Sequence, residues 1–299
     1  MRGEPSNQGL CVFGEVLFDE FPDGRRVLGG APFNVAWHLA AFGEAPLLIS
    51  RVGEDADGIE VRRSMRGHGM DASGLQTDPE LPTGRVRVVF EDNEPSYDIV
   101  HPAAWDAIAE PTGGPRCSFL YHGSLALRDE ASRDALQALR AGRPKNVFVD
   151  VNLRPPWWNR DQVLASLDGA QWVKLNQHEL DALAPGRAAE TQAFRLIETH
   201  GLEGLLVTAG EEGAAMYTAQ GEVIRAHMIP ALEVVDAVGA GDALSSVTIL
   251  GMIRGWPLQT TLERAQAFAS AIVGRRGATV GDPAFYQPFI VAWGRDAAV

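Results

Sequence analysis

Two aspartates and a run of very small residues stand together in the string VDAVGAGDALSSV, from Val235 to Val247. Gly239, Ala240 and Gly241 are small enough for their backbone amides to approach a ligand, and the apolar run after them can form a helix. A helix N-terminus attracts anions because its first amides are unpaired and its dipole is positive there. Asp242 could then accept a proton from a hydroxyl while the amides hold a phosphoryl group. Taken alone, the string is more typical of an aspartate that caps a helix.

A second string that could bind a ligand is GGAPFNVA, from Gly29 to Ala36. Gly30 can offer its backbone amide, and the Asn34 side chain has both a donor and an acceptor for a hydroxyl group. A plain glycine turn before a helix would look the same. The chain contains neither a Walker loop nor the G-x-G-x-x-G fingerprint of dinucleotide-binding folds, because Leu244 stands where the third glycine would be.

Length, charge and hydrophobicity limit the kinds of protein that could carry these strings. The 299 residues suffice for one large α/β domain or two ordinary ones, and a hydrophobic content of 45% allows a sizeable core. A net charge of −13 argues against non-specific binding to nucleic acid. We expect a cytoplasmic protein, because no apolar run approaches the roughly 18 residues of a membrane span and no signal peptide is visible. Cys11 and Cys117 lie in apolar stretches and are expected to be buried free thiols.

The strings must be positioned by strands and helices that alternate along the chain. Helical patterns at Asn34–Phe42, Asp129–Arg140 and Glu190–Thr199 lie between strand-like runs, which predicts parallel β-α-β units covered on both faces. In such sheets, ligands bind at the carboxyl ends of the strands. The expected strands are Leu10–Phe13, Ala45–Val52, Cys117–Tyr121, Asn146–Val151, Trp172–Leu175 and Gly204–Thr208.

The stretch from Thr83 to Trp105 has a different pattern, because polar and apolar residues alternate in two arms around Asp92–Pro95. This alternation predicts a hairpin with one solvated face. A second antiparallel piece is expected near Glu15–Val27, with its turn at Pro22-Asp23-Gly24. The two pieces could form a small sheet that closes over the active face as a lid, or they could be two surface hairpins. We expect one domain with an inserted lid.

GGAPFNVA and DAVGAGD, in this order, resemble the two signatures of the ribokinase-like (PfkB) carbohydrate kinases. The chain is most similar to bacterial fructokinases, with 2-keto-3-deoxygluconate kinases as a neighbouring branch. The resemblance implies an α/β fold, a three-layer α/β/α sandwich with a mainly parallel central sheet and a small β-sheet lid. It implies a single kinase domain over residues 1–299, with the lid formed from about 15–28 and 83–105. The other strings that carry it are FGEVLFDEFP, PTGRV, YDIVHPAAWD, HGSLAL, VDVNLRPPWW, KLNQHEL, VTAGEEGA and GRRGA.

The resemblance assigns roles to residues on the acceptor side of the site. Asp242 matches the family's catalytic base, which takes a proton from the sugar hydroxyl that attacks ATP. The matched anion hole consists of Gly239, Ala240 and Gly241. The matched sugar contacts are Asp19, Gly30, Asn34 and Arg154. From its type alone, Arg154 could also be a surface arginine paired with an acid.

The resemblance also assigns a nucleotide side. The matched residues there are Asn176, Thr208, Gly210 and Gly213. Glu179 matches a glutamate that holds Mg²⁺ through water, although a helix cap with an acidic first turn would show the same spacing from Asn176. Asp236 and Ala278 match a loop that binds a monovalent cation, such as K⁺, in many members of the family.

The activity implied is that of an ATP-dependent kinase that phosphorylates a primary hydroxyl of a monosaccharide, with D-fructose as the first choice of acceptor. The alternative acceptors are 2-keto-3-deoxygluconate, ribose and nucleosides, and the alternative of a different class is a non-catalytic sugar sensor. Neither nucleic acid nor a membrane is expected as a partner, and paired lids could form a homodimer. Two positions depart from the family pattern, since Ala237 replaces the usual threonine and Phe33 is bulkier than the usual residue.

Overall fold

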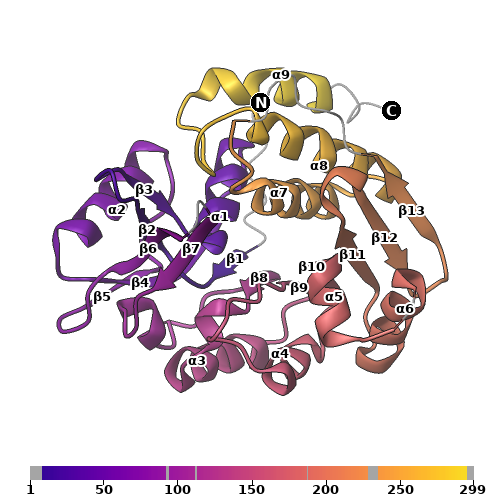
Figure 1. Ribbon diagram of the computed structural model, residues 1–299, viewed down its shortest axis with the longest axis horizontal. Coiled ribbons are helices and arrows are strands. Elements are labelled where there is room, and N and C mark those ends of the chain that lie inside the picture. Colours follow the sequence, from indigo (N-terminus) through magenta and orange to yellow (C-terminus); the bar gives the residue numbers. More distant parts are fainter. Residues whose placement is uncertain (1–8, 92–93, 112, 187, 228–234, 295–299) are drawn as a thin grey trace.

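In the computed structural model, which describes residues 9–294 except 92–93, 112, 187 and 228–234, nine strands form one central sheet (Figure 1). The strand order is β13-β12-β11-β10-β9-β8-β1-β4-β5. All neighbours from β11 to β5 are parallel, whereas β12 and β13 are antiparallel. The strands are β1 (Leu10–Phe13), β4 (Leu47–Gly53), β5 (Leu75–Asp78), β8 (Phe119–Gly123), β9 (Asn146–Asp150), β10 (Trp172–Asn176), β11 (Gly204–Thr208), β12 (Ala214–Thr218) and β13 (Val223–Ala226). All six strands predicted from the sequence are present.

Helices cover both faces of the central sheet, which is why its inner strands are mainly apolar. Figure 1 shows α1, α7, α8 and α9 on one side and α3 to α6 on the other, and each side has its own buried apolar cluster. The α-helices are α1 (Ala31–Ala41), α2 (Ala56–Gly67), α3 (Glu130–Ala141), α4 (Arg160–Leu167), α5 (Gln177–Leu183), α6 (Ala189–His200), α7 (Ala240–Arg254), α8 (Leu258–Val273) and α9 (Pro283–Gly294). Short 3₁₀ helices are η1 (Ala104–Ala107), η2 (Leu125–Leu127) and η3 (Gly210–Glu212). The predicted three-layer α/β/α arrangement is confirmed.

A second, four-stranded sheet is formed by β2 (Leu17–Glu20), β3 (Arg26–Gly29), β6 (Gly84–Glu91) and β7 (Glu94–Ile99), in the order β3-β2-β6-β7. The predicted hairpin is confirmed as the antiparallel pair β6–β7. The pair β2–β3 is also antiparallel, whereas β2 and β6 run parallel. The tip of the β6–β7 hairpin, and the segment 1–8 on which the absence of a signal peptide rested, lie outside the described residues.

Two aspartates at the start of α2 hold the small sheet against the body of the protein. Asp55 caps α2 and accepts hydrogen bonds from the backbone and hydroxyl of Thr83, at 2.8 and 2.7 Å. The buried Asp57 forms ion pairs with Arg26 of β3, at 2.5 Å, and Arg85 of β6, at 2.9 Å. Two strands of the small sheet are therefore fastened to one helix end of the body.

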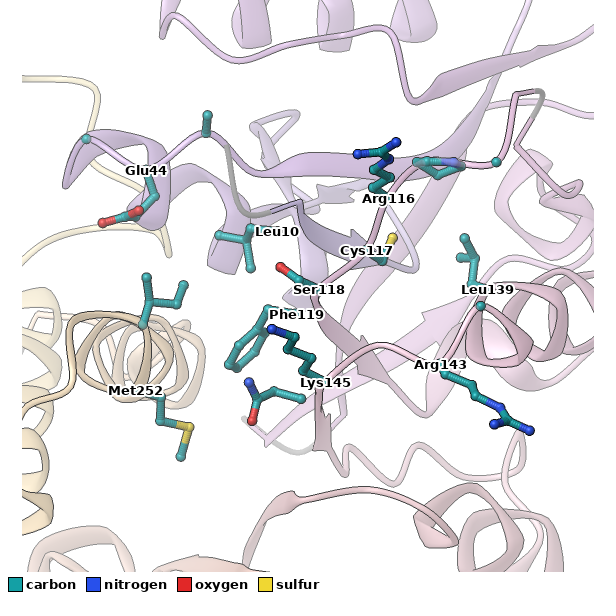
Figure 2. Close-up of a pocket in the computed structure, with 17 residues that line it drawn as sticks. Leu10, Glu44, Arg116, Cys117, Ser118, Phe119, Leu139, Arg143, Lys145 and Met252 are labelled. Carbon is teal, nitrogen blue, oxygen red and sulfur yellow. The ribbon is translucent and has the colours of Figure 1, made fainter. Parts of the chain in front are cut away.

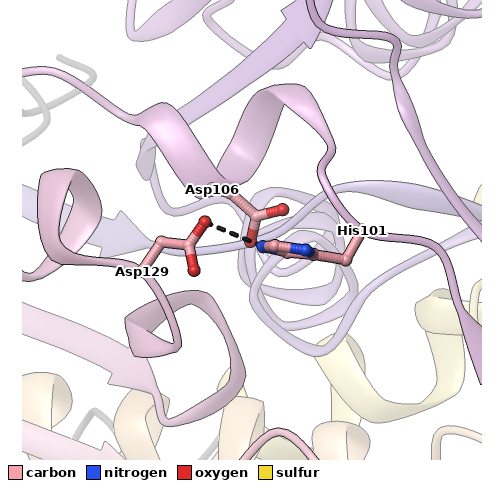
Figure 3. Close-up of side chains that lie close together, drawn as sticks. All are labelled: His101, Asp106 and Asp129. Atoms are coloured by element: carbon pink, nitrogen blue, oxygen red, sulfur yellow. Dashed lines mark hydrogen bonds and ion pairs between the residues drawn. The ribbon is translucent and has the colours of Figure 1, made fainter.

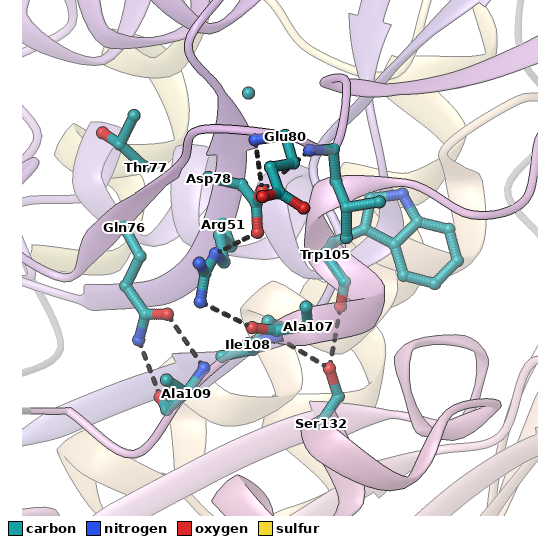
Figure 4. Close-up of polar contacts among 12 residues, drawn as sticks. Arg51, Gln76, Thr77, Asp78, Glu80, Trp105, Ala107, Ile108, Ala109 and Ser132 are labelled. Atoms are coloured by element: carbon teal, nitrogen blue, oxygen red, sulfur yellow. Dashed lines mark hydrogen bonds and ion pairs between the residues drawn. The ribbon is translucent and has the colours of Figure 1, made fainter.

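The segment around η1 is fixed by polar contacts to β4, β5 and α3, as Figure 4 shows. Arg51 pairs with Asp78 at 2.9 Å and donates to the carbonyl of Ala107 at 2.9 Å. Ser132 accepts from the backbone of Ile108 and donates to the carbonyl of Trp105, whose side chain is fully buried. The string YDIVHPAAWD thus ends in a rigid piece of the core.

The expectation of two free thiols is wrong, because Cys11 and Cys117 form a disulfide with their Cα atoms 5.6 Å apart. Strands β1 and β8 are parallel neighbours with Leu10 opposite Phe119, which brings the two cysteines within bonding range. No sequence pattern reveals this pairing, since 106 residues separate the cysteines. Cys117 lines a cavity of about 1020 Å³ near the amino ends of these strands. Figure 2 shows Cys117 there, next to Ser118 and Phe119.

No helix within the described residues combines the length and the apolar character needed to cross a lipid bilayer.

Replacing Cys117 by serine is expected to lower the free energy of unfolding by about 3–4 kcal/mol, because the disulfide restricts a long loop in the unfolded chain. Urea unfolding of the oxidised protein measures the loss. Dithiothreitol should destabilise the wild type to a similar extent and leave the variant unchanged. Equal urea midpoints for oxidised and reduced wild type would contradict the disulfide.

Candidate active site

Helix α7 begins within VDAVGAGDALSSV, the string from Val235 to Val247. Gly239 is its N-cap residue, with a φ of +82°, and Asp242 lies in the first turn, as predicted. A Cβ on Gly239 would lie 2.3 Å from the Cβ of Ala278, so only glycine fits against that residue. Of the amides of Gly239, Ala240 and Gly241, that of Ala240 contacts the carbonyl of Ala237 at 3.4 Å, and no described side chain caps the others beside the Asp242 carboxylate.

Asn34 of α1 reaches the same point from the other end of the chain. Its Nδ2 donates to Oδ2 of Asp242 at 2.7 Å. Gly30 is the N-cap residue of α1, with a φ of +106°. A Cβ on Gly29 would lie 3.5 Å from Oδ2 of Asp19 and 3.8 Å from Oδ1 of Asn34. The structure thus brings Asp19, Asn34 and Asp242 together around one glycine.

The acids in this cluster titrate far above their usual range. Burial raises the pKa of the Asp242 carboxyl to about 6. The hydrogen bond from Asn34 and the charges of Lys174 and Arg154 act in the opposite direction. Burial likewise raises the pKa of Asp19 to about 6, and Arg154 opposes it. Asp242 is therefore ionised at neutral pH while remaining basic enough to accept a proton.

Arg154, in the loop after β9, is exposed and contacts the carbonyl of its neighbour Leu153 at 3.4 Å. It forms no ion pair with any described residue, so the alternative of a surface ion pair is not found there. Its charge lowers the pKa of both Asp19 and Asp242. The structure therefore brings Arg154 within electrostatic reach of the cluster and leaves its guanidinium group accessible.

Glu15 is a member of the cluster that the sequence analysis missed. It follows β1 and is only 2% exposed, and its Oε2 has no hydrogen-bond partner among the described residues. Burial, reinforced by the charge of Asp242, raises the pKa of Glu15 to about 7. The signal in the sequence was a glutamate directly after an apolar strand, because glutamate is almost never fully buried unless it has a partner.

Beneath α7 lies a buried ion pair that was also missed. Lys174 of β10 donates to Asp150 of β9 at 2.8 Å. The second carboxylate oxygen of Asp150 accepts from Ser245 of α7 at 2.6 Å and from Tyr121 of β8 at 3.3 Å. A lysine inside the predicted strand Trp172–Leu175 was the signal, but its partner depends on strand register.

The residues assigned to the nucleotide side lie at the carboxyl ends of β10 and β11. Asn176 and Thr208 are paired positions of these two strands. Gly210 and Gly213 bound the short turn of η3, and Gly213 accepts from the amide of Ala209 at 2.9 Å. The structure thus brings all four predicted residues to one edge of the sheet, as expected for a ligand site in a parallel α/β fold.

Glu179 and Asn176 form a capping box at the start of α5. Oδ1 of Asn176 accepts from the amide of Glu179, while Glu179 accepts from the amides of Asn176 at 2.8 Å and Leu153 at 3.0 Å. Burial raises the pKa of Glu179. Each carboxylate oxygen of Glu179 thus accepts one hydrogen bond and keeps a lone pair for a further partner.

Asp236 and Ala278 lie in loops that are joined to each other. Asp236 accepts from the amides of Val238 at 3.0 Å and Gly277 at 3.1 Å. The carbonyl of Ala278 lies 2.9 Å from Nε2 of His38. Burial lowers the pKa of His38 to about 3, so the ring is neutral and its Nε2 carries the proton donated to Ala278. Each oxygen proposed for a monovalent cation thus already accepts one hydrogen bond.

A second group of possible metal ligands, His101, Asp106 and Asp129, is drawn in Figure 3. Asp106 is committed to Arg128, which contacts its two oxygens at 2.6 and 2.7 Å. His101 pairs with Asp129 at 2.9 Å. A guanidinium group therefore already satisfies the most buried carboxylate, and the trio does not form a metal site.

Comparison with known proteins agrees with the geometry. The family described as pfkB family carbohydrate kinase matches residues 9–284. A fructokinase of Escherichia coli is 32% identical, over 81% of this chain and 84% of its own length. The bifunctional protein HldE of Nitrobacter hamburgensis is 28% identical over 91% of this chain, which spans only 61% of that relative.

Among solved structures, the aminoimidazole riboside kinase of Salmonella enterica, complexed with aminoimidazole riboside and an ATP analogue, superposes with a TM-score of 0.82. It is 25% identical, and the similarity covers 94% of this chain and 99% of the other. The ribokinase-like fold implied by the sequence motifs is thereby confirmed.

Asp242→Asn is expected to stabilise the protein at pH 8 but not at pH 4. A folded pKa of about 6, above the usual 3.8, means that the Asp242 contribution to stability falls as pH rises from 4 to 6. The variant removes the buried charge, and its amide oxygen can still accept from Asn34. Calorimetry should show a rise of a few degrees in Tm at pH 8. The exposed Asp134→Asn serves as control, and equal Tm values for both variants at pH 8 would contradict the assignment.

Proposed function

Because the chain belongs to the pfkB family of carbohydrate kinases, we propose that it transfers the γ-phosphate of ATP to a primary hydroxyl of a monosaccharide, with D-fructose as the preferred acceptor. The observation that carries the proposal is the Asn34–Asp242 hydrogen bond at the N-terminus of α7. It joins the two sequence signatures into one site that has a base and free amides side by side.

In the proposed reaction, the sugar lies over Asp19, Gly30 and Asn34, with its hydroxyl directed at Asp242. Asp242 accepts the hydroxyl proton as the oxygen attacks the γ-phosphorus. The amides of the Gly239–Gly241 turn donate to the oxygens of the transferred group and stabilise the charge that develops there. Arg154 reaches the same space and could orient hydroxyl or carboxylate groups of the acceptor.

ATP is proposed to lie along the carboxyl ends of β10 and β11, next to Asn176, Thr208, Gly210 and Gly213. The relative solved with an ATP analogue supports this choice of donor. Mg²⁺, held by the phosphates and by Glu179 through water, would neutralise phosphate charge. A monovalent cation at Asp236 and Ala278 stays a prediction, to be tested by comparing rates in K⁺ and in N-methylglucamine salts.

The preference for fructose is supported by the E. coli relative and by the resemblance to fructokinases. The aminoimidazole riboside kinase structure keeps a riboside as the second candidate acceptor. Two residues of the string YDIVHPAAWD do not favour any one sugar, because Trp105 is buried in the core and Asp106 is paired with Arg128. We further propose that the small sheet acts as a lid over the site and that two copies pair through it.

A panel of acceptors with ATP and Mg²⁺, followed by ADP release, tests the function. D-fructose should give the highest kcat/KM, ahead of ribose, 2-keto-3-deoxygluconate and nucleosides. A different best acceptor would replace fructose and keep the kinase. ATP consumption that no sugar accelerates, together with tight sugar binding, would favour a non-catalytic sensor.

Asp242→Asn should lower kcat by about 10³-fold or more, because the hydroxyl proton then has no acceptor. Calorimetric titration should show fructose and ATP–Mg²⁺ binding within about threefold of the wild type, since the hydrogen bond to Asn34 can persist. The base would be misassigned if the variant turned over at close to the wild-type rate.

The rate should fall as pH drops below about 6, the pKa of Asp242 and of Asp19. Only the ionised Asp242 can accept the proton, so activity is present above this pKa and is lost below it. A profile of kcat/KM from pH 5 to 9 checks the sign. A rate that is flat down to pH 5 would argue against a carboxylate base.

A further inference from the structure

Lys174 is a charged side chain inside the apolar central sheet. It is 8% exposed, and its neighbours Val173 and Leu175 on β10 are fully buried. Taking an ammonium group out of water is costly unless it is paired. The partner is Asp150, which stands opposite Lys174 in the parallel pair β9–β10 and accepts its hydrogen bond at 2.8 Å.

The ion pair is connected directly to α7. Asp150 accepts from Ser245, which lies one turn after Asp242 on this helix, at 2.6 Å. A Cβ on Gly241 would lie 3.1 Å from Nζ of Lys174. The ammonium group therefore lies next to the Gly239–Gly241 turn. A larger residue at Gly241 would displace either the lysine or the turn.

Lys174 remains charged in this position. Burial alone would lower its pKa, but the adjacent Asp150 carboxylate, with further contributions from Asp242 and Glu179, raises it. At Asp242 the charge of Asp150 raises the carboxyl pKa, whereas that of Lys174 lowers it. A fixed positive charge in a site shielded from water acts strongly on its surroundings.

We propose that Lys174 is a positioning and electrostatic residue of the transfer site: its ammonium group, held by Asp150, supplies positive charge behind the Gly239–Gly241 amides as the phosphoryl group is transferred. The inference rests on the proposed kinase function. It assigns Lys174 an effect through its position next to Gly241 and no contact with the substrate. Its effect must therefore appear where charge develops, not in the binding of ground-state ATP or sugar.

The simpler alternative is that Lys174 only neutralises Asp150. Three variants separate the two explanations. Lys174→Met removes the charge and leaves Asp150 unpaired, so it is expected to lower Tm. Asp150→Asn/Lys174→Met removes both charges and should recover much of that Tm. Tyr121→Phe, the matched control, removes one hydrogen bond from Asp150 but keeps the ammonium group.

If the proposal is correct, the double variant folds yet has a kcat about 10²-fold below the wild type, with KM values for ATP and sugar within about threefold. Tyr121→Phe should keep kcat within about threefold. Recovery of the wild-type kcat in the double variant would overturn the proposal, as would an equal loss of kcat in Tyr121→Phe.

A binding measurement keeps the test independent of the acceptor. ADP with aluminium fluoride and Mg²⁺ mimics the transferring group, and its Kd is compared with that of ADP alone by calorimetry. The double variant should lose about 10²-fold of the additional affinity that fluoride gives, with the Kd for ADP within about threefold. If fluoride increases the affinity of the wild type and not that of the double variant, but the wild type phosphorylates no sugar, the acceptor chemistry is refuted and the role of Lys174 is retained. Equal fluoride effects in the wild type and the double variant would refute that role.

Discussion

The 2.7 Å hydrogen bond between Asn34 and Asp242 is the contact on which the site depends, because it joins residues 208 positions apart in the chain. It can form only if α1 and α7 begin at the same place over the sheet. The two helices lie side by side on one face, where Val35, Leu39, Val247 and Leu250 share an apolar cluster (Figure 1). Hydrophobic packing along the helices thus fixes the polar contact at their ends.

The site places several ionisable groups in the buried interior, where a charged group is costly. Glu15, Asp19 and Asp242 are acids whose pKa burial raises, and for Asp242 the hydrogen bond from Asn34 and the charges of Lys174 and Arg154 oppose this. The protein therefore gives up stability at neutral pH to keep carboxylates that can exchange protons there. Lys174 below α7 is also buried, and its own desolvation is compensated by the ion pair with Asp150.

Much of the architecture can be predicted from the sequence, because local patterns specify it. The strands at Leu10–Phe13 and Gly204–Thr208 have the predicted bounds, and the glycine turn marks the start of α7. The edge strand β5 and the antiparallel pair β12–β13 were not predicted, because their sequences LQTD, AAMYT and VIRA mix polar residues or alanines with residues typical of strands. The disulfide and the Lys174–Asp150 pair depend on which strands are neighbours and in which register. Strand order and register are set by contacts between residues that are far apart in the sequence, and hydrophobic periodicity carries no information about these contacts.

The proposed acceptor side of the site is divided between two parts of the fold. Asp19 comes from β2 of the small sheet, whereas Asn34 and Asp242 come from helices on the central one. The distance between these acids is therefore set by whatever holds the two sheets together. Asp55 and Asp57 do so at the start of α2, through Thr83, Arg26 and Arg85. Arg26 and Arg85 lie opposite Glu20 and Phe18 of β2, respectively, so the ion pairs to Asp57 hold the small sheet on both sides of Asp19.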